Sequence, residues 1–394
     1  MLRTESELLE IIEGLREPFT ASAPTHDREA SFPAASFELL REQGMLALTA
    51  PIELGGEGLW SGDRFLTYYR LLSALAAFDA NTSQLLQVHS HALGILSNAA
   101  TPAQRELYLE PIIRGGKVLA SVGSESAPST NSTGLYNQEL QPQDDGSWLL
   151  TCEKHFASVS AGADSLLIWR AVPGEAPYEM RTVCVVVPAD APEVELIDNW
   201  DVLGMRATVS WTVRVKNLRL PAEAIIGEPG YWVRDDPRTF SLGFASNHLG
   251  EAEGILEFCL DWVRARPHLQ NSDLMLYRFG DFGARLFGVR AAMESAAREW
   301  ELGEDFDRAE LLSLHVLHLA KKAVLEISQV AFDICGARAI FKQYPLEQAY
   351  RDARSFTLHT RDDHLTCTVG KGLLYGDFSG KGYIDGATVP RVGK

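Results

Sequence analysis

The pattern of apolar residues changes twice along the chain, and this change limits the possible folds more than any single motif does. Residues 1–116 place apolar side chains at three- and four-residue steps, as in SFPAASFELLREQGMLAL (31–48), which is typical of helices buried on one face. Residues 117–230 are rich in β-branched and aromatic residues, and Trp211, Val213 and Val215 alternate on one face of a predicted strand. Helical spacing returns over residues 231–394.

Helices and strands are therefore segregated along the chain, which argues against a doubly wound α/β sheet. No GxGxxG follows a predicted strand, so a Rossmann dinucleotide site is not indicated. The sequence predicts an α+β protein with three domains. These are an N-terminal helical domain (1–116), a middle β-barrel or β-sandwich domain (117–230) and a C-terminal four-helix bundle (231–394).

Charge and cysteine usage exclude several classes of function. The formal net charge is -17 over 394 residues, which argues against nucleic acid or an anionic membrane as a partner. The five cysteines include no CxxC pair, so a disulfide framework or a zinc site is not expected, and no metal is predicted. The start, MLRTESELLEIIEGLREPF, is acidic and lacks the features of a signal peptide. We expect a cytoplasmic protein.

Five segments, in this order and spacing, resemble the acyl-CoA dehydrogenase superfamily, and the match runs over nearly the whole chain. The segments are LGGEGLW (54–60), the Ser124-Glu125 pair, CEKHFASVSAGADSLLIW (152–169), WDVLGMRATVSWTVRVKNLRLPAEAIIG (200–227) and CGARAIFKQYPLEQAYRDAR (335–354). The resemblance implies a flavin bound between the β domain and the C-terminal bundle. It also implies a homotetramer, built as a dimer of dimers.

Two departures from the dehydrogenase pattern concern the cofactor and the catalytic base. The usual glycine pair is replaced by Gly336-Ala337, and Ala339 also departs from the pattern. These changes favour FMN over FAD, with FAD as the alternative. Desaturation of an acyl-CoA needs a positioned carboxylate. The two positions at which family members carry that glutamate are occupied here by Phe240 and by His359-Thr360.

The sequence is similar to a related branch, the two-component flavin monooxygenases of the dibenzothiophene monooxygenase type, through CGAR (335–338) and TLH (357–359). That similarity implies a reduced-flavin-dependent monooxygenase with a separate flavin reductase as partner. It would act on a small heteroatom-containing or aromatic substrate through a C4a-(hydro)peroxyflavin. Two alternatives stay open: an FAD-dependent acyl-CoA dehydrogenase, and a non-catalytic member of the family.

Three residues are the candidates for catalysis by this resemblance. Ser158 follows a predicted strand and would hydrogen-bond the flavin, although it could equally end the strand in a turn. His359 can exchange a proton near neutral pH, although a histidine at a helix end also suits the helix dipole. His89 and His91 point to different helix faces, and we favour His89 as the one facing the active site.

The remaining candidates would bind the cofactor or the substrate. Ser124, Phe156, Ser158, Gly336 and Arg338 are predicted to contact the flavin. The ordinary alternatives are a polar loop for Ser124, core packing for Phe156 and a salt bridge for Arg338. Met205, Arg206 and Thr360 are predicted to border the substrate pocket.

Overall fold

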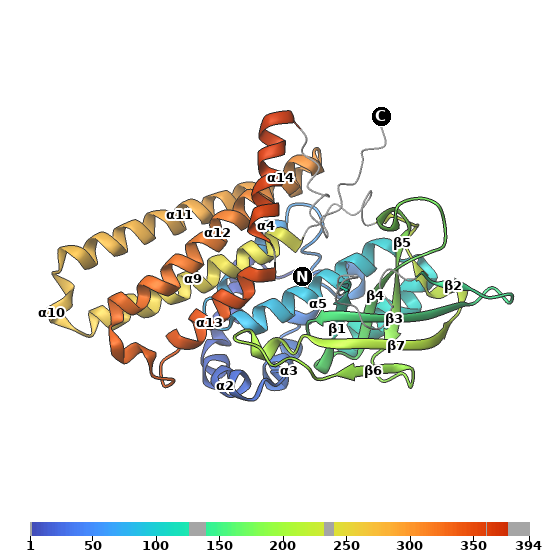
Figure 1. Ribbon diagram of the computed structural model, residues 1–394, viewed down its shortest axis with the longest axis horizontal. Helices are drawn as coiled ribbons and strands as arrows, with labels where there is room; N and C mark the ends of the chain where they lie inside the picture. Colours follow the sequence, from blue (N-terminus) through green and yellow to red (C-terminus); the bar gives the residue numbers. More distant parts are fainter. Residues whose placement is uncertain (1, 126–138, 232–239, 360, 377–394) are drawn as a thin grey trace.

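The computed structural model describes residues 2–125, 139–231, 240–359 and 361–376. Figure 1 shows the strands gathered at one end of the molecule and three long helices at the other. The N-terminal helices are α1 (Glu5–Gly14), α2 (Arg16–Glu29), α3 (Ala34–Glu42), α4 (Phe65–Ala76), α5 (Ala80–Ala99), α6 (Pro102–Gln104) and α7 (Glu110–Gly115).

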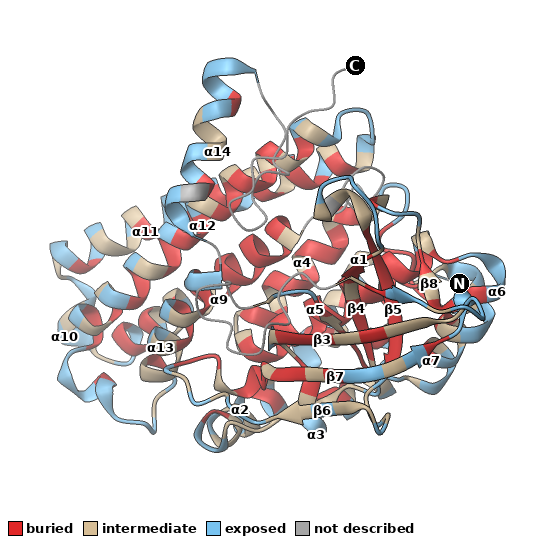
Figure 2. Cartoon of the chain, turned by 45° about the vertical axis from the view of Figure 1, so that its right-hand side comes forward, coloured by how far each residue is buried: buried red, intermediate tan, exposed pale blue. Residues whose placement is uncertain are grey.

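Helix α5 is the central helix of the N-terminal part. Asp79 caps it by accepting a hydrogen bond from Thr82 N at 2.9 Å, which satisfies one of the free N–H groups of the first turn. The helix packs against α4 on one side and against strand β1 on the other. Nearly all of its residues are buried, as Figure 2 shows by their colour.

The strands form two four-stranded sheets. One sheet has the order β1-β4-β5-β8, in which β1 runs parallel to β4, and the other is antiparallel with the order β2-β3-β7-β6. The strands are β1 (Leu119–Val122), β2 (Gln141–Pro142), β3 (Trp148–Ala157), β4 (Ser165–Ala171), β5 (Thr182–Pro188), β6 (Val194–Ile197), β7 (Trp211–Leu220) and β8 (Ile225–Ile226).

The C-terminal helices form a bundle in which α9 packs against both α12 and α4. They are α9 (Phe240–Arg264), α10 (Pro267–Gln270), α11 (Asp273–Leu302), α12 (Phe306–Cys335), α13 (Leu346–Phe356) and α14 (Asp362–Tyr375). The predicted fold of a helical N-terminal part, a middle β part and a helical bundle is therefore confirmed. No helix in the described ranges has both the length and the apolar content needed to cross a bilayer.

Candidate functional site

Two loops with strained backbone meet at the end of strand β3. Phe156, the next-to-last residue of β3, and Val159 of the first loop have φ values of 54° and 70°, and on the second loop Met205 and Val209 have φ values of 55° and 40°. The loops are joined by a hydrogen bond of 3.0 Å from Val159 N to Thr208 O. Left-handed backbone at residues with side chains costs about 1–3 kcal/mol each, and such positions concentrate at functional sites.

Polar groups from three parts of the chain form a continuous series of hydrogen bonds through Ser158, which we call the Ser158 chain. Gln84 of α5 donates from Nε2 to Ser158 Oγ at 3.2 Å, and Ser158 Oγ lies 2.9 Å from Ser210 Oγ. Ser210 Oγ lies 2.8 Å from Thr208 Oγ1, which donates to Met205 O at 2.8 Å. Because protein groups hold the Ser158 hydroxyl from two sides, it is positioned before any ligand binds.

An exposed aromatic ring lies on the same turn as Ser158. Phe156 is 68% exposed, and its ring makes an edge contact with Trp200 at a centroid distance of 5.9 Å. Trp200 is itself fixed, because its Nε1 donates to Met205 O at 3.0 Å. The turn therefore presents a flat apolar face close to a positioned hydroxyl.

His359 is the last residue of the short helix η9 (Thr357–His359) and packs against Phe244 of α9, with ring centroids 4.0 Å apart. The residue keeps an exposed surface. Desolvation by the surrounding protein, with a smaller contribution from the charge of Lys321, lowers the pKa of His359 to about 4. The ring is therefore neutral at pH 7, with one nitrogen that donates a hydrogen bond and one that accepts.

His248 is a second histidine beside these aromatic rings. It is buried in α9 and packs against Phe356 at a centroid distance of 4.5 Å. Burial, and then the charges of Lys321 and His359, lower the pKa of His248 to about 3. Within the described part of the chain, its Nδ1 has no hydrogen-bond partner. We call Phe240, Phe244, His248, Phe356 and His359 the aromatic cluster.

Asp352 of α13 connects the aromatic cluster to the Ser158 chain. Its carboxylate accepts hydrogen bonds from Met205 N and from Asn81 Nδ2, the second at 2.8 Å. The residue is 3% exposed, and burial raises the pKa of Asp352 to about 6. Helix α13 is followed directly by η9, which ends at His359. The Asp352 carboxylate therefore holds the segment that contains His359 against the loop that contains Met205.

One face of α5 is polar although the helix is buried. Asn81, Gln84, Gln87 and His91 follow one another at steps of three and four residues, and each is at most 3% exposed. Gln87 Oε1 accepts a hydrogen bond from Asn247 Nδ2 of α9. Sequence reasoning missed these amides, although polar residues at helical spacing within an apolar segment are the pattern that would have indicated them.

The structure corrects the expectation that His89 faces the active site. Its Nδ1 accepts a hydrogen bond from Leu119 N at 3.0 Å, so its Nε2 carries the proton and donates to Leu46 O at 2.8 Å. Both ring nitrogens therefore join α5 to neighbouring backbone, and burial lowers the pKa of His89. His91 lies on another face of α5 and packs against Phe240 at a centroid distance of 4.3 Å.

Ser124 lies at the edge of the described residues, beside a buried group of charges. Its carbonyl accepts a hydrogen bond from His155 N at 2.9 Å. The neighbouring Glu125 pairs with Lys154 at 2.6 Å and with Arg170. Glu125 therefore has a structural role in the β domain, and the flavin contact of Ser124 stays a prediction.

The other predicted residues are not all brought to the Ser158 chain. Met205 belongs to it, but the guanidinium of Arg206 donates to Asp27 O and Val202 O, both at 2.8 Å. The expectation that Arg206 lines a substrate site is corrected, because these backbone contacts direct it toward α2. Gly336 and Arg338 are exposed in the turn between α12 and α13. Thr360 lies outside the described residues.

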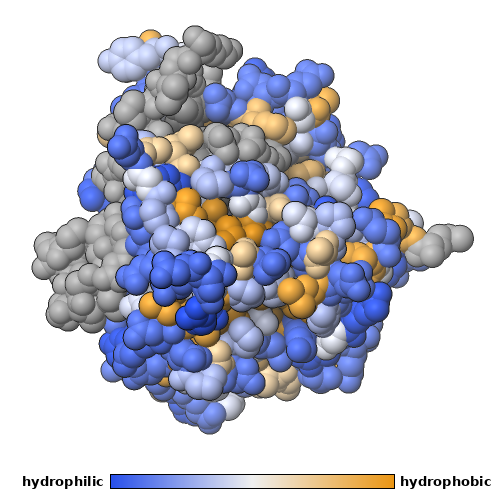
Figure 3. Space-filling model, turned by 90° about the vertical axis from the view of Figure 1, so that its right-hand side faces the viewer, coloured by the Kyte–Doolittle hydropathy of each residue, from blue (hydrophilic) through white to orange (hydrophobic). Residues whose placement is uncertain are grey.

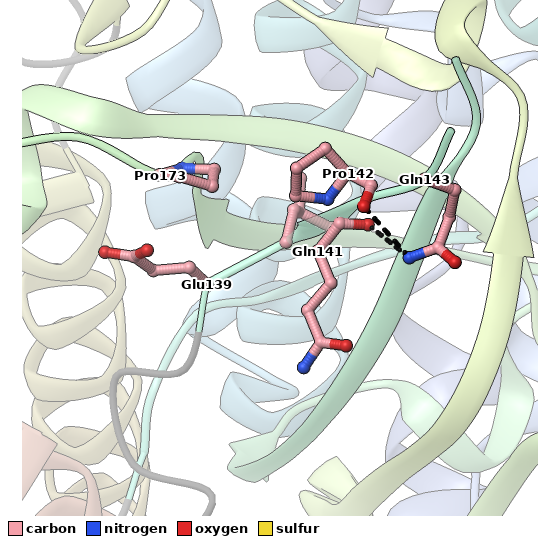
Figure 4. A pocket seen from close by; sticks show the side chains of 6 residues that line it. Glu139, Gln141, Pro142, Gln143 and Pro173 are labelled. Carbon is pink, nitrogen blue, oxygen red and sulfur yellow. Dashed lines mark hydrogen bonds between the residues drawn. The ribbon is translucent and has the colours of Figure 1, made fainter. Parts of the chain in front are cut away.

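A shallow depression lies elsewhere, next to strand β2, and Figure 4 shows its lining. Gln143 Nε2 donates to the carbonyl oxygens of Gln141 and Pro142, both at 3.1 Å, and Glu139 forms an ion pair with Arg181. This depression contains no predicted site residue. Figure 3, which faces the sheet end of the molecule, shows a mainly hydrophilic surface with apolar groups in separate patches.

Comparison with known protein families gives two matches along the chain. Residues 10–116 match the N-terminal domain of acyl-CoA dehydrogenase, and residues 242–363 match the C-terminal domain of acyl-CoA dehydrogenase. These two segments contain α4, α5, α12, α13, η9 and all but the first two residues of α9, which are the helices around the aromatic cluster.

Individual relatives distinguish two branches. The chain is 27% identical to dibenzothiophene monooxygenase from Rhodococcus erythropolis over 96% of both proteins. It is 25% identical to the mitochondrial short-chain specific acyl-CoA dehydrogenase of Bos taurus over 88% of this chain and 84% of that protein. Among solved structures, FMN-bound TdsC from Paenibacillus sp. A11-2 is 25% identical with a TM-score of 0.82, over 93% of this chain and 97% of that chain. TdsC has also been solved with FMN and indole together.

Proposed function

We propose that this chain, which belongs to the acyl-CoA dehydrogenase superfamily, is a flavin-dependent monooxygenase of the dibenzothiophene monooxygenase branch. The observation that carries the proposal is the Ser158 chain, in which Gln84 and Ser210 hold one hydroxyl at 3.2 Å and 2.9 Å next to an exposed aromatic ring. The monooxygenase relatives match slightly more of the chain than the dehydrogenase relatives do.

The residues at the end of β3 fit a planar ring with apolar faces and a polar edge, as a flavin has. Phe156 presents a flat apolar ring, and Ser158, which is half-buried, presents a hydroxyl. Within the described ranges, Gln84 Oε1 and Trp211 Nε1 are buried without a hydrogen-bond partner. Buried polar atoms normally have partners, so these two are consistent with a site that a ligand completes. FMN is the favoured flavin, since a similar protein, TdsC, binds it.

When bound, the reduced flavin supplies the two electrons with which dioxygen gives one oxygen atom to a substrate and the other to water. The protein would position the flavin and the substrate, exclude water from between them and hold protons beside them. Ser158 Oγ would accept a hydrogen bond from an N–H group at the polar edge of the ring, because its own proton is directed to Ser210 when Thr208 donates to Met205 O. His359, neutral at pH 7 because its pKa is lowered to about 4, would exchange a hydrogen bond with the substrate without adding charge. Phe244 and Phe356 would keep water out, which protects reactive oxygen species from wasteful decay.

The buried carboxylates near the site favour a monooxygenase over an enzyme that desaturates acyl-CoA. A dehydrogenase needs an ionised carboxylate that reaches the substrate. Phe240 occupies one of the two base positions and belongs to the aromatic cluster. Asp352 is the carboxylate that binds Met205 N and Asn81, and burial raises the pKa of Glu251 well above its usual value, so neither is an ionised carboxylate that is free to take a proton from a substrate.

The aromatic cluster also suggests the class of substrate. Phe240, Phe244 and Phe356 contribute apolar ring surface, and the two histidines of the cluster are neutral at pH 7. Surfaces of this kind bind planar aromatic molecules by edge and face contacts. We infer that the substrate is an aromatic compound that contains sulfur or nitrogen, with a separate flavin reductase supplying reduced FMN.

The flavin phosphate requires a cation, and the turn after α12 supplies one. Gly336 has a φ of +74°, and within the described part of the chain nothing lies within 4 Å of the position of its Cβ atom; Arg338 follows in an exposed short helix, η8 (Ala337–Ile340). Arginine suits phosphate because its planar fork binds two oxygens at once. We propose that Arg338 binds the phosphate in an assembled oligomer, and that Ser124 contacts the ring. The cytoplasmic location stays a prediction.

The exposed apolar residues of the bundle support assembly into a homotetramer as a dimer of dimers. Tyr277 and Phe287 of α11 are each 71% exposed, and Leu373, Leu374 and Tyr375 of α14 are similarly exposed. Adjacent exposed residues of this size usually mark an interface. Light scattering on the purified protein should give four times the mass of one chain, and Phe287→Glu should lower it. A monomer at micromolar concentration would contradict this proposal.

The function is tested by supplying FMN reduced without oxygen and then mixing with 18O-labelled dioxygen. With dibenzothiophene and indole as probes, we expect 18O-labelled products by mass spectrometry, and none when the enzyme is omitted. A parallel sample loaded with FAD is mixed with butyryl-CoA. Bleaching of the FAD by butyryl-CoA together with an absence of labelled product would show that the dehydrogenase alternative is correct. A chain that binds neither flavin would be the non-catalytic member.

A further inference from the structure

Two buried cysteines meet where α9 packs against the end of α12. Cys259 and Cys335 have their Sγ atoms 3.8 Å apart and share a hydrogen bond. Cys259 is 0% exposed and lies in the interior of α9, whereas Cys335 is 7% exposed and is the last residue of α12. Neither residue belongs to the Ser158 chain or to the aromatic cluster, so the proposed function does not use them.

We propose that Cys259 and Cys335 are a peroxide-reactive pair that forms an intramolecular disulfide. A disulfide needs the two sulfur atoms at ~2.05 Å, so from 3.8 Å they must approach by about 1.8 Å. Pairs of thiols at this separation react with each other once one of them is oxidised, because the second thiol is already in place to attack.

The surroundings allow Cys335 to be the residue that reacts first and moves. The hydrogen bond that Cys335 shares with Cys259 lowers the pKa of Cys335, as does the nearby guanidinium of Arg266, although burial opposes them, whereas the pKa of Cys259 is raised. The thiolate is the reactive form of cysteine. Gly336 follows Cys335, and no atom of the described residues lies within 4 Å of the position where its Cβ would be. The end of α12 therefore has space to shift, while Cys259 is held in the middle of a long helix.

The reaction balances with hydrogen peroxide as the oxidant. The Cys335 thiolate attacks one peroxide oxygen, the O–O bond breaks, and the hydroxide that leaves takes up the thiol proton as water. The Cys259 thiol then attacks the sulfenic acid, the S–O bond breaks, and a second water leaves as the S–S bond forms. Two thiols lose two electrons in total, and one peroxide becomes two waters. The source of peroxide in the enzyme, which rests on the proposed function, is oxygen reduced by flavin without transfer to substrate.

The bond would have a consequence for the turn that begins at Gly336. A shift of the end of α12 moves the exposed segment that carries Arg338, the proposed phosphate ligand. The oxidised form should therefore bind FMN more weakly than the reduced form, so that peroxide released by the enzyme would limit further turnover.

The experiment treats the reduced, flavin-free full chain with hydrogen peroxide, then denatures and alkylates it and maps its peptides by mass spectrometry. Before alkylation we expect a mass about 2 Da lower than that of the untreated chain, and after alkylation a linked Cys259–Cys335 peptide that dithiothreitol fully reverses. Cys152 and Cys184, buried in β3 and β5, are the matched controls and should stay alkylated as free thiols. Cys259→Ala and Cys335→Ala should each abolish the linked peptide.

FMN affinity of the oxidised and reduced chains gives the second readout, by fluorescence titration. We expect affinity to fall at least several-fold on oxidation in the native chain and to be unaffected by peroxide in Cys259→Ala. The proposal is overturned if Cys259 and Cys335 react with peroxide no more than Cys152 and Cys184 do. Equal FMN affinity of the oxidised and reduced chains would overturn the inference that the disulfide moves the turn that carries Arg338. Failure of FMN to bind either form would count against the monooxygenase function and leave the disulfide result standing.

Discussion

Replacing Ser158 by alanine is expected to lower the yield of oxygenated product per reduced FMN consumed by about 10²-fold, the usual effect of removing one positioned hydrogen-bonding group from a reacting centre. The hydroxyl is held by Gln84 and Ser210 before a ligand binds, so its loss removes a hydrogen bond that solvent cannot replace in the same place. Consumption of reduced FMN by oxygen should continue, with hydrogen peroxide as the product. The yield is measured as product formed against reduced FMN oxidised, with peroxide quantified in the same sample.

The control for Ser158→Ala is Ser160→Ala. Ser160 lies on the same turn and is buried, but its Oγ donates to Val209 O at 3.2 Å rather than joining the Ser158 chain. This variant should lose about 1 kcal/mol of stability, as for an ordinary hydrogen bond, and keep the native yield of product. If Ser158→Ala binds FMN normally and keeps the native yield, Ser158 is not the hydroxyl that hydrogen-bonds the flavin. If both variants lose the yield equally, the turn as a whole is required rather than the one hydroxyl.

Replacing Gly254 by alanine is expected to destabilise the fold, because α9 and α4 touch through their backbones at this point. A Cβ atom on Gly254 would lie 1.9 Å from Ala77 O, and one on Gly250 would lie 2.0 Å from Ser73 O. A backbone carbonyl cannot rotate away as a side chain can, so the helices must separate. Overpacking of this kind costs about 1–3 kcal/mol, and more where the backbone must move. Denaturant unfolding should show a lower midpoint with a similar slope.

Gly14→Ala is the matched control for Gly254→Ala. Gly14 also lies in a helix and is exposed, and no residue that the structure describes has an atom within 4 Å of its Cβ position. Alanine is the better helix former by up to about 1 kcal/mol, so this variant should be as stable as the native chain or slightly more stable. Equal stability of Gly254→Ala and the native chain would mean that α9 and α4 are farther apart than the structure has them.

The order of helices and strands was predictable from the sequence, because a segment's apolar period depends on its own residues. The alternation of Trp211, Val213 and Val215 indicates a strand with one buried face, and the three- and four-residue spacing in residues 31–48 indicates helix. Ser158 was named as a candidate from its own segment, KHFAS, through the family resemblance, and its contact with the flavin stays a prediction. The structure then supplied its partners, Gln84 and Ser210, which come from segments far away in the chain.

Only the tertiary structure decided which histidine of α5 faces the aromatic cluster. His89 and His91 are two residues apart, so the sequence shows that they point in different directions and no more. The choice depends on how α5 is rotated, and that rotation is set by Leu46 O and Leu119 N, which bind His89 from segments 43 and 30 residues away. The link from Asp352 to Met205 N spans 147 residues. Local periodicity determines which elements form, whereas the buried polar contacts that place a site are made between elements, and these exist only after the chain has packed.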